Sequence, residues 1–179
     1  MYRFAAASKD ESIVFGAAHP GHREQQTHEW IDFMQSQGIQ RVCCLLSESQ
    51  LSRYDDLLGI YRCCFGAEQV CWAPVDDFRL VASDLLTCEI LPFLTMAEQQ
   101  QQRVVVHCSG GMGRTGHILA AWLVAERGFS NKAAIAAVKA TGRNPYEAVI
   151  AAPFKGRSPW TVALELDELL DISRRFRKL

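Results

Sequence analysis

The chain has 179 residues, of which 49% are hydrophobic, enough to build one domain over residues 1–179. Its 19 Lys and Arg residues against 20 Asp and Glu leave a formal charge of −1, so the overall field favours neither nucleic acid nor a membrane as partner. No stretch has the apolar length of a membrane span, and seven cysteines, an odd number, favour a reducing cytoplasm over a disulfide scaffold.

Short apolar runs of strand length alternate with helical patterns along the chain. Strands are predicted, the first of them weakly, over residues 12–18, 41–46, 69–73 and 103–107. Helices are predicted over residues 25–37, 78–98 with a kink or division at Pro92, 115–126, 131–140, and onward from Ser158 and Pro159. Strands rich in Val and Leu and separated by helices predict an α/β fold, with a central, mostly parallel sheet flanked by helices on both faces.

Neither the adjacent cysteine pairs nor the histidines predict a metal site. Cys43–Cys44 and Cys63–Cys64 lack the C-x-x-C spacing, and neighbouring side chains of a strand point to opposite faces. We therefore interpret these cysteines as small buried hydrophobic residues. His19 and His22 lie in a turn-like H-P-G-H segment without a cysteine or carboxylate nearby, which predicts a surface turn.

The most informative stretch is V-V-V-H-C-S-G-G-M-G-R-T-G, residues 104–116. It joins a buried strand to a buried helix, and Gly110, Gly111 and Gly113 allow the backbone conformations that turn several N–H groups towards one point. The positive end of the following helix faces the same point. The stretch therefore predicts a cradle for an anion.

Three side chains of this stretch predict chemistry on a bound phosphate. Cys108 lies where N–H dipoles, the helix end and a guanidinium favour the thiolate, so it is the expected nucleophile. The planar guanidinium of Arg114 can bond to two phosphate oxygens. Thr115 places a hydroxyl beside the Cys108 sulfur and can donate a hydrogen bond to this sulfur when it leaves as a thiolate. The expected phosphate-binding residues are Ser109, Gly110, Gly111, Met112, Gly113 and Arg114.

An acid is also needed to protonate the departing oxygen. The segment A-P-V-D-D-F offers Asp76 and Asp77, which precede Cys108 by 32 and 31 residues. Both follow a predicted strand, and loops after parallel strands meet at one edge of the sheet. Either carboxyl group can therefore reach the cradle.

These residues resemble a known family. H-C-S-G-G-M-G-R-T-G matches the H-C-x5-R-[ST]-G signature of protein tyrosine and dual-specificity phosphatases, and A-P-V-D-D-F resembles their acid loop. The resemblance implies hydrolysis without metal or cofactor through a cysteinyl-phosphate, with His107 supporting the cysteine through hydrogen bonds. Aligning Pro74 with the first proline of that loop assigns the acid to Asp77, with Asp76 as the alternative.

Two further features have open interpretations. T-G-R-N-P-Y-E-A, residues 141–148, resembles the loop that positions water in the family, but the usual glutamine is missing. Either Arg143 or Asn144 contacts water or substrate, or the segment is an ordinary helix stop and turn. Some family members also protect the nucleophile by a disulfide to a second cysteine, and the sequence does not show whether Cys43 or Cys44 is near enough.

The compact length and the absence of an aromatic recognition loop resemble the dual-specificity branch. The cradle has no lysine to meet extra phosphates, so we expect phosphotyrosine, with phosphoserine or phosphothreonine, in protein partners. A small-molecule, inositol or RNA 5′-phosphatase would use the same chemistry. A phosphate-binding pseudophosphatase is a further alternative, against which the intact Cys108, Arg114 and acid residues argue.

Overall fold

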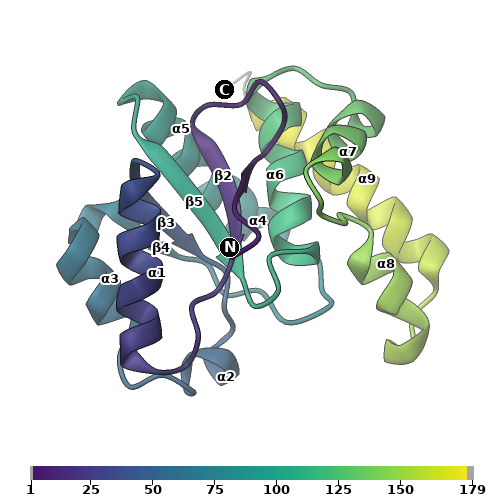
Figure 1. The fold of residues 1–179 in the computed structure, drawn as a ribbon. Coiled ribbons are helices and arrows are strands. Elements are labelled where there is room, and N and C mark those ends of the chain that lie inside the picture. The colour runs from purple at the N-terminus through teal and green to yellow at the C-terminus, as the bar shows by residue number, and fades with distance from the viewer. Residues whose placement is uncertain (1, 177–179) are drawn as a thin grey trace.

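The computed structural model describes residues 2–176 and is built on a five-stranded sheet in the order β1-β2-β5-β3-β4 (Figure 1). The strands are β1 (Ala5–Ala6), β2 (Val14–Ala18), β3 (Ile39–Cys44), β4 (Val70–Trp72) and β5 (Arg103–Cys108). All pairings except β1 with β2 are parallel. The prediction of a mostly parallel sheet is confirmed.

Helices cover both faces of this sheet, as predicted (Figure 1). On one face lie α1 (Glu24–Ser36) and α3 (Leu57–Phe65), which contact β3. On the other lie α5 (Leu91–Gln99) and α6 (Gly113–Glu126), with α7 (Asn131–Ala140) and α9 (Pro159–Phe176) packed on α6. The shorter elements are α2 (Glu48–Leu51), η1 (Ala67–Gln69), α4 (Ser83–Leu85), η2 (Leu86–Ile90), α8 (Glu147–Ala151) and η3 (Ala152–Lys155).

The core consists of two layers divided by the sheet. Cys43 packs on the α6 side and Cys44 on the α1 side, so the alternation expected of a strand holds for this pair. Every residue of α6 from Gly113 to Ala125 is buried, which agrees with its apolar sequence. Burial of this whole helix fixes its amino-terminal end, which carries the Gly-rich loop, against the sheet.

The predicted helix over residues 78–98 differs from the structure. It begins only at Ser83, so residues 78–82 extend the loop after β4, and η2 separates α4 from α5. The N–H of Leu91 bonds to the carbonyl of Leu86, a wide turn directly before Pro92, which has no N–H to donate. The wide turn therefore accommodates Pro92 within a helical run that continues from residue 83 to residue 99.

One cysteine was interpreted wrongly as buried. Cys63 is exposed on α3, and its neighbour Cys64 is only partly buried. Neither α3 nor the short β1, α2 and α8 was predicted. The sequence of α3 contains Gly59, which propensity disfavours within a helix, but the Asp56 carboxylate accepts a hydrogen bond from its N–H at 2.9 Å and caps the helix.

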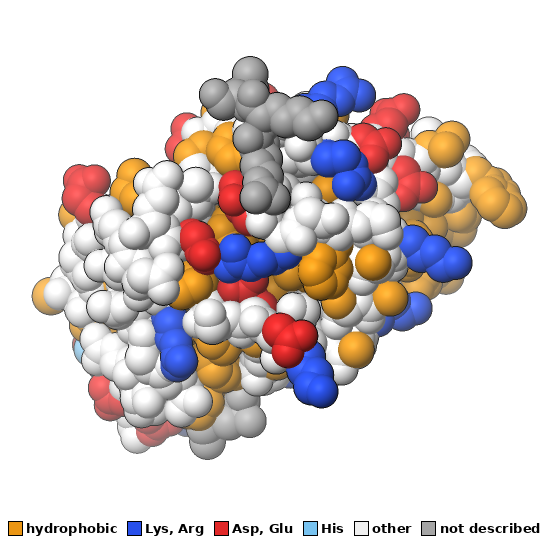
Figure 2. Space-filling model, turned by 90° about the horizontal axis from the view of Figure 1, so that it is seen from above, with side chains coloured by type: hydrophobic (Ala, Val, Ile, Leu, Met, Phe, Trp, Pro, Cys, Tyr) orange, Lys and Arg blue, Asp and Glu red, His pale blue; other side chains and the backbone are white. Residues whose placement is uncertain are grey.

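Large hydrophobic side chains are exposed mainly at one end of the molecule. Ile150, Phe154, Trp160 and Leu164 are 62%, 88%, 83% and 64% exposed and belong to α8, η3 and the start of α9. Figure 2 shows hydrophobic side chains protruding at the end that holds these helices. Within residues 2–176, the helices are all too short or too polar to traverse a bilayer.

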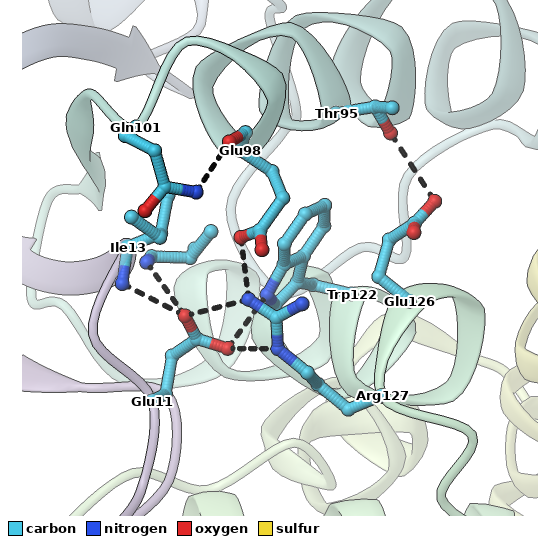
Figure 3. Close-up of polar contacts among 9 residues, drawn as sticks. Glu11, Ile13, Thr95, Glu98, Gln101, Trp122, Glu126 and Arg127 are labelled. Atoms are coloured by element: carbon cyan, nitrogen blue, oxygen red, sulfur yellow. Dashed lines mark hydrogen bonds and ion pairs between the residues drawn. The ribbon is translucent and has the colours of Figure 1, made fainter.

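A buried carboxylate ties the segment before β2 to the end of α6 (Figure 3). Glu11, whose side chain is 0% exposed, accepts hydrogen bonds from the N–H of Ile13 at 2.8 Å, from Trp122 Nε1 at 3.0 Å and from Arg127 Nε at 2.9 Å. Burial raises the pKa of Glu11, but the bonds from Arg127, Ile13 and Trp122 outweigh it, so the pKa is lowered. The carboxylate thus stabilises the folded state in its charged form.

Candidate active site

The loops that follow four parallel strands meet at one edge of the sheet (Figure 1). The Gly-rich loop, residues 109–112, connects β5 to α6, and the acid loop, residues 73–82, follows β4. The loops after β2 and β3 carry His19 and Ser47. The predicted site residues are therefore brought together by the topology.

The backbone of the Gly-rich loop leaves amides free for a ligand. Gly111 has φ +67°, and a Cβ there would lie 2.6 Å from the Ala17 carbonyl, so only glycine fits. The carbonyl of Ser109 accepts from His19 N–H at 3.1 Å. Among residues 2–176, no acceptor takes the N–H groups of Gly110, Gly111 and Met112. These donors and the positive end of the 14-residue α6 form an anion cradle.

Cys108 lies at the base of this loop, at the end of β5, with 2% of its surface exposed. Its sulfur accepts a hydrogen bond from Thr115 Oγ1 at 3.2 Å. Thr115 belongs to the first turn of α6 and is fully buried. A hydroxyl donor therefore faces the sulfur, which is the placement predicted for these two residues.

Arg114, in the first turn of α6, contacts the acid loop and α2. Its Nη2 lies 3.0 Å from Asp77 Oδ1, and its Nη1 donates to the Val75 carbonyl at 2.9 Å and to Gln50 Oε1 at 2.7 Å. The guanidinium is 2% exposed, so its position is fixed by these partners. Gln50, on the short α2, was missed by sequence reasoning because it is 64 residues away in the chain.

The acid loop presents two aspartates in different ways. The carboxylate of Asp77 is 49% exposed and faces Arg114, whereas no ion pair links Asp76 to another described residue. The loop is tied to α6, because the N–H of Val81 donates to His117 Nε2 at 3.2 Å. Burial lowers the pKa of His117 to about 4, so the imidazole stays neutral and keeps accepting this bond.

His107 is fully buried beneath the Gly-rich loop. Its Nε2 lies 3.3 Å from the Tyr61 hydroxyl, and its ring packs edge-on against Trp30. Burial, with the neighbouring His19, lowers the pKa of His107 to about 3. Within the described chain, Nδ1 of His107 has no hydrogen-bond partner. The neutral ring thus supports β5 mainly through packing and through Tyr61.

Arg143 binds backbone rather than the cradle. It is 3% exposed, and Nη2 donates to the carbonyls of Arg3, at 2.8 Å, and of Gly16. Burial lowers the pKa of Arg143 to about 10, although the attraction of the nearby Cys108 sulfur acts to raise it. A Cβ on Gly16 would collide with both Arg143 and Thr115. The guanidinium of Arg143 therefore lies close to the first turn of α6, behind the Gly-rich loop.

The other residues of this segment form a turn and a cap. Asn144 Oδ1 accepts from the N–H of Tyr146 at 3.3 Å, as in an ordinary turn. Glu147 was not predicted as a site residue, yet its Oε2 accepts from the Gly113 N–H at 2.8 Å. Only glycine at 113 permits this approach, because a Cβ would lie 2.1 Å from that oxygen. A carboxylate therefore lies at the rim of the anion cradle, and its signal in the sequence was an acid at a helix start.

His19 lies beside the Gly-rich loop, its Nδ1 bonds to the Tyr54 hydroxyl, and its ring lies 5.1 Å from that of His22. Residues 2–176 contain no cluster of three or more His, Cys, Asp or Glu side chains placed to hold a metal ion.

Burial raises the pKa of Cys44, next to His107 in strand register, to about 12, so this thiol stays protonated.

The chain is similar to known phosphatases. Residues 15–128 match the family model described as "Polymorphic toxin system, DSP-PTPase phosphatase". A comparison with curated protein sequences gave no match.

Among solved structures, Tk-PTP in its active form is 22% identical with a TM-score of 0.66, covering 88% of this chain and 93% of its own. PTPMT1 in complex with PI(5)P is 16% identical with a TM-score of 0.63, covering 98% and 94%. TpbA of P. aeruginosa in complex with pTyr is 19% identical with a TM-score of 0.53, covering 86% and 85%. At these identities the likeness shows the fold.

Proposed function

The chain belongs to the DSP-PTPase phosphatase family, within the cysteine-dependent protein tyrosine phosphatase superfamily, and from this premise we propose that it hydrolyses phosphate monoesters through a phosphocysteine on Cys108. The observation that carries the proposal is one convergence of groups. Thr115 Oγ1 lies 3.2 Å from the Cys108 sulfur, and Arg114 Nη2 lies 3.0 Å from Asp77, at the cradle of free amides. A nucleophile, an anion clamp and an acid meet there.

In the first step, the Cys108 thiolate attacks phosphorus in line with the ester oxygen. The S–P bond forms while the P–O bond to the leaving group breaks, and the acid form of Asp77 gives its proton to the departing oxygen. The Arg114 fork and the cradle amides hold the phosphoryl oxygens. Arg114 must exchange its contact with Asp77 for the phosphate, which frees Asp77 to turn to the leaving oxygen.

In the second step, water attacks the phosphocysteine. The Asp77 carboxylate accepts a proton from this water, the new P–O bond forms, and the S–P bond breaks to release inorganic phosphate. The hydroxyl of Thr115 donates to the sulfur as it regains negative charge. This hydrogen bond stabilises the leaving thiolate and favours breakdown of the intermediate.

We favour protein phosphotyrosine, with phosphoserine and phosphothreonine, as the substrate class. The side chains of residues 109–113 include no lysine or arginine, so the loop itself has no cation for a second phosphate. One similar structure holds pTyr and another PI(5)P, so the fold accommodates both kinds of ester. Small-molecule phosphates are the alternative with the same chemistry.

The test combines trapping with a substrate panel. We expect acid quenching during turnover of a phosphotyrosine peptide to leave one phosphoryl group on the peptide containing Cys108, visible by mass spectrometry. The Cys108→Ser variant should keep phosphopeptide binding and lose turnover, because a serine hydroxyl stays protonated. Turnover near the wild-type rate in Cys108→Ser would refute the mechanism. Faster hydrolysis of an inositol phosphate or a nucleotide than of any phosphopeptide would refute the substrate class.

A further inference from the structure

An apolar groove of about 500 Å³ lies beside the candidate active site. Its apolar lining consists of Phe78, Ile150, Ala151 and Phe154. Phe78 directly follows Asp77 of the acid loop, and Glu147, at the other wall, accepts from the cradle residue Gly113. The groove thus begins where the ester group of a bound phosphate would lie and runs outward along α8.

The outer end of the groove is a protruding corner with aromatic and basic side chains. We call residues 148–164 the α8–α9 corner. Phe154 and Trp160 flank a turn at Gly156, which has φ +66°, and are 88% and 83% exposed. Outside the corner and the groove, the most exposed large hydrophobic side chain of the described surface is Met96 at 46%, so the exposure of the two aromatic side chains is unusually high.

The corner keeps one cation without a carboxylate partner among the described residues. Residues 148–164 include Lys155 and Arg157 and no acid. Lys155 Nζ lies 5.8 Å from the centre of the Phe78 ring, and Arg157 pairs with Glu165, one residue beyond the corner. The neighbouring carboxylates Glu147 and Asp77 already have partners in Gly113 and Arg114. Glu165 neutralises Arg157, so Lys155, which has no carboxylate partner among the described residues, is the cation of the corner that can attract an anionic surface.

We propose that the α8–α9 corner docks the protein onto an anionic phospholipid surface. Protruding aromatic side chains enter the boundary between headgroups and acyl chains, while the adjacent Lys155 meets lipid phosphates. The groove offers no free strand edge, and its apolar wall comes from helices whose backbone groups bond within the helix, so it has few partners for the backbone of an extended peptide. An acyl chain has no such requirement. Docking at this corner places the cradle beside the lipid surface.

Trp160 provides a direct probe of this contact. Trp30 and Trp122 are fully buried, and Trp72 is held by a bond from its Nε1 to the Leu46 carbonyl at 2.8 Å, so Trp160 is the strongly exposed tryptophan. We expect its emission to shift to shorter wavelength when vesicles of phosphatidylcholine with one third phosphatidylglycerol are added. Pure phosphatidylcholine vesicles should give a weaker shift. Trp160→Phe should keep vesicle binding and lose the shift.

Cosedimentation with the same vesicles measures affinity. Phe154→Ala with Trp160→Ala should lower binding at least about tenfold, since each aromatic side chain loses most of its apolar burial. Lys155→Ala should lower it about fivefold on the anionic vesicles alone. Met96→Ala, an exposed hydrophobic residue on α5, is the matched control and should bind like the wild type.

Three results would overturn the proposal. These are absence of binding to anionic vesicles, equal binding of the double variant, and a concentration-dependent dimer that the double variant abolishes, which would assign the corner to a second copy of the chain. Hydrolysis of a soluble aryl phosphate is measured in parallel. Because Trp160 does not line the groove, Trp160→Ala should keep this activity, so failure of docking and failure of the phosphatase chemistry are distinguishable.

Discussion

Replacement of Asp77 by Asn tests how the acid loop and Arg114 work together. The amide keeps the size of the carboxyl group and cannot give a proton to the leaving oxygen. We expect kcat for phenyl phosphate, a poor leaving group, to fall by about 10² to 10⁴. The fall for p-nitrophenyl phosphate should be much smaller, because that leaving group departs without a proton.

The same substitution should tighten phosphate binding. In the free protein Asp77 lies 3.0 Å from Arg114, and this contact must break before the guanidinium can grip a phosphate. Since Asp77 is 49% exposed, solvent screening limits the pair to about 0.5 to 1 kcal/mol. Removing it should therefore lower the Kd for inorganic phosphate or vanadate about two- to fivefold, by the conversion of free energy to affinity.

Asp76→Asn is the matched control, because it changes the neighbouring carboxyl of the same loop, which has no ion pair with Arg114 in the described chain. Steady-state kinetics on the two esters and calorimetry with phosphate give both readouts. The reasoning is refuted if Asp76→Asn shows the leaving-group dependence, or if Asp77→Asn slows both esters equally and leaves phosphate affinity unchanged.

Three further predictions concern the frame of the site. Glu11→Ala should lower the free energy of unfolding by about 3 to 5 kcal/mol, measured in urea, because it leaves Arg127 and buried N–H donors without their acceptor; a loss under about 1 kcal/mol would contradict this. Gly111→Ala should abolish phosphate binding while the chain stays folded, checked by calorimetry and circular dichroism, since φ is +67° there; wild-type affinity would be the opposing result. Acid should destabilise the protein. His107 and His117 have pKa values of about 3 and about 4 in the folded state, so below pH 6.5 they bind protons in the unfolded state while they stay neutral in the folded state. The free energy of unfolding then falls by up to about 1.4 kcal/mol per pH unit for each histidine, and equal urea midpoints at pH 7 and pH 5 would count against it.

The parts of the fold that were predictable have local causes. Apolar runs bounded by turn residues gave β3, β4 and β5 to within two residues at each end, and α7 was predicted with its bounds. The glycines of residues 104–116 located the cradle, because a strand, a Gly-rich turn and a helix follow one another in the chain. Elements that follow one another in the chain could be predicted without knowledge of tertiary contacts.

The residues that were missed act across long distances in the chain. Gln50 reaches Arg114, and Glu147 reaches Gly113, from α2 and α8, which are too short to show a helical period. Arg143 was considered for water or substrate, and its actual partners are carbonyls of the first strands, which no local pattern indicates. A membrane was excluded as a partner because the formal charge of the chain is −1. The net charge of the whole chain does not show that residues 148–164 contain no acid.

The contact of Arg143 with the carbonyls of Arg3 and Gly16 has a practical consequence for handling the protein. The first strand is joined, through this guanidinium, to the back of the loop that holds Cys108. An affinity tag or fusion partner placed just before Arg3 is therefore attached next to a residue that bonds to this support. Rates from differently tagged preparations are comparable only after the tag has been removed or moved to the opposite terminus.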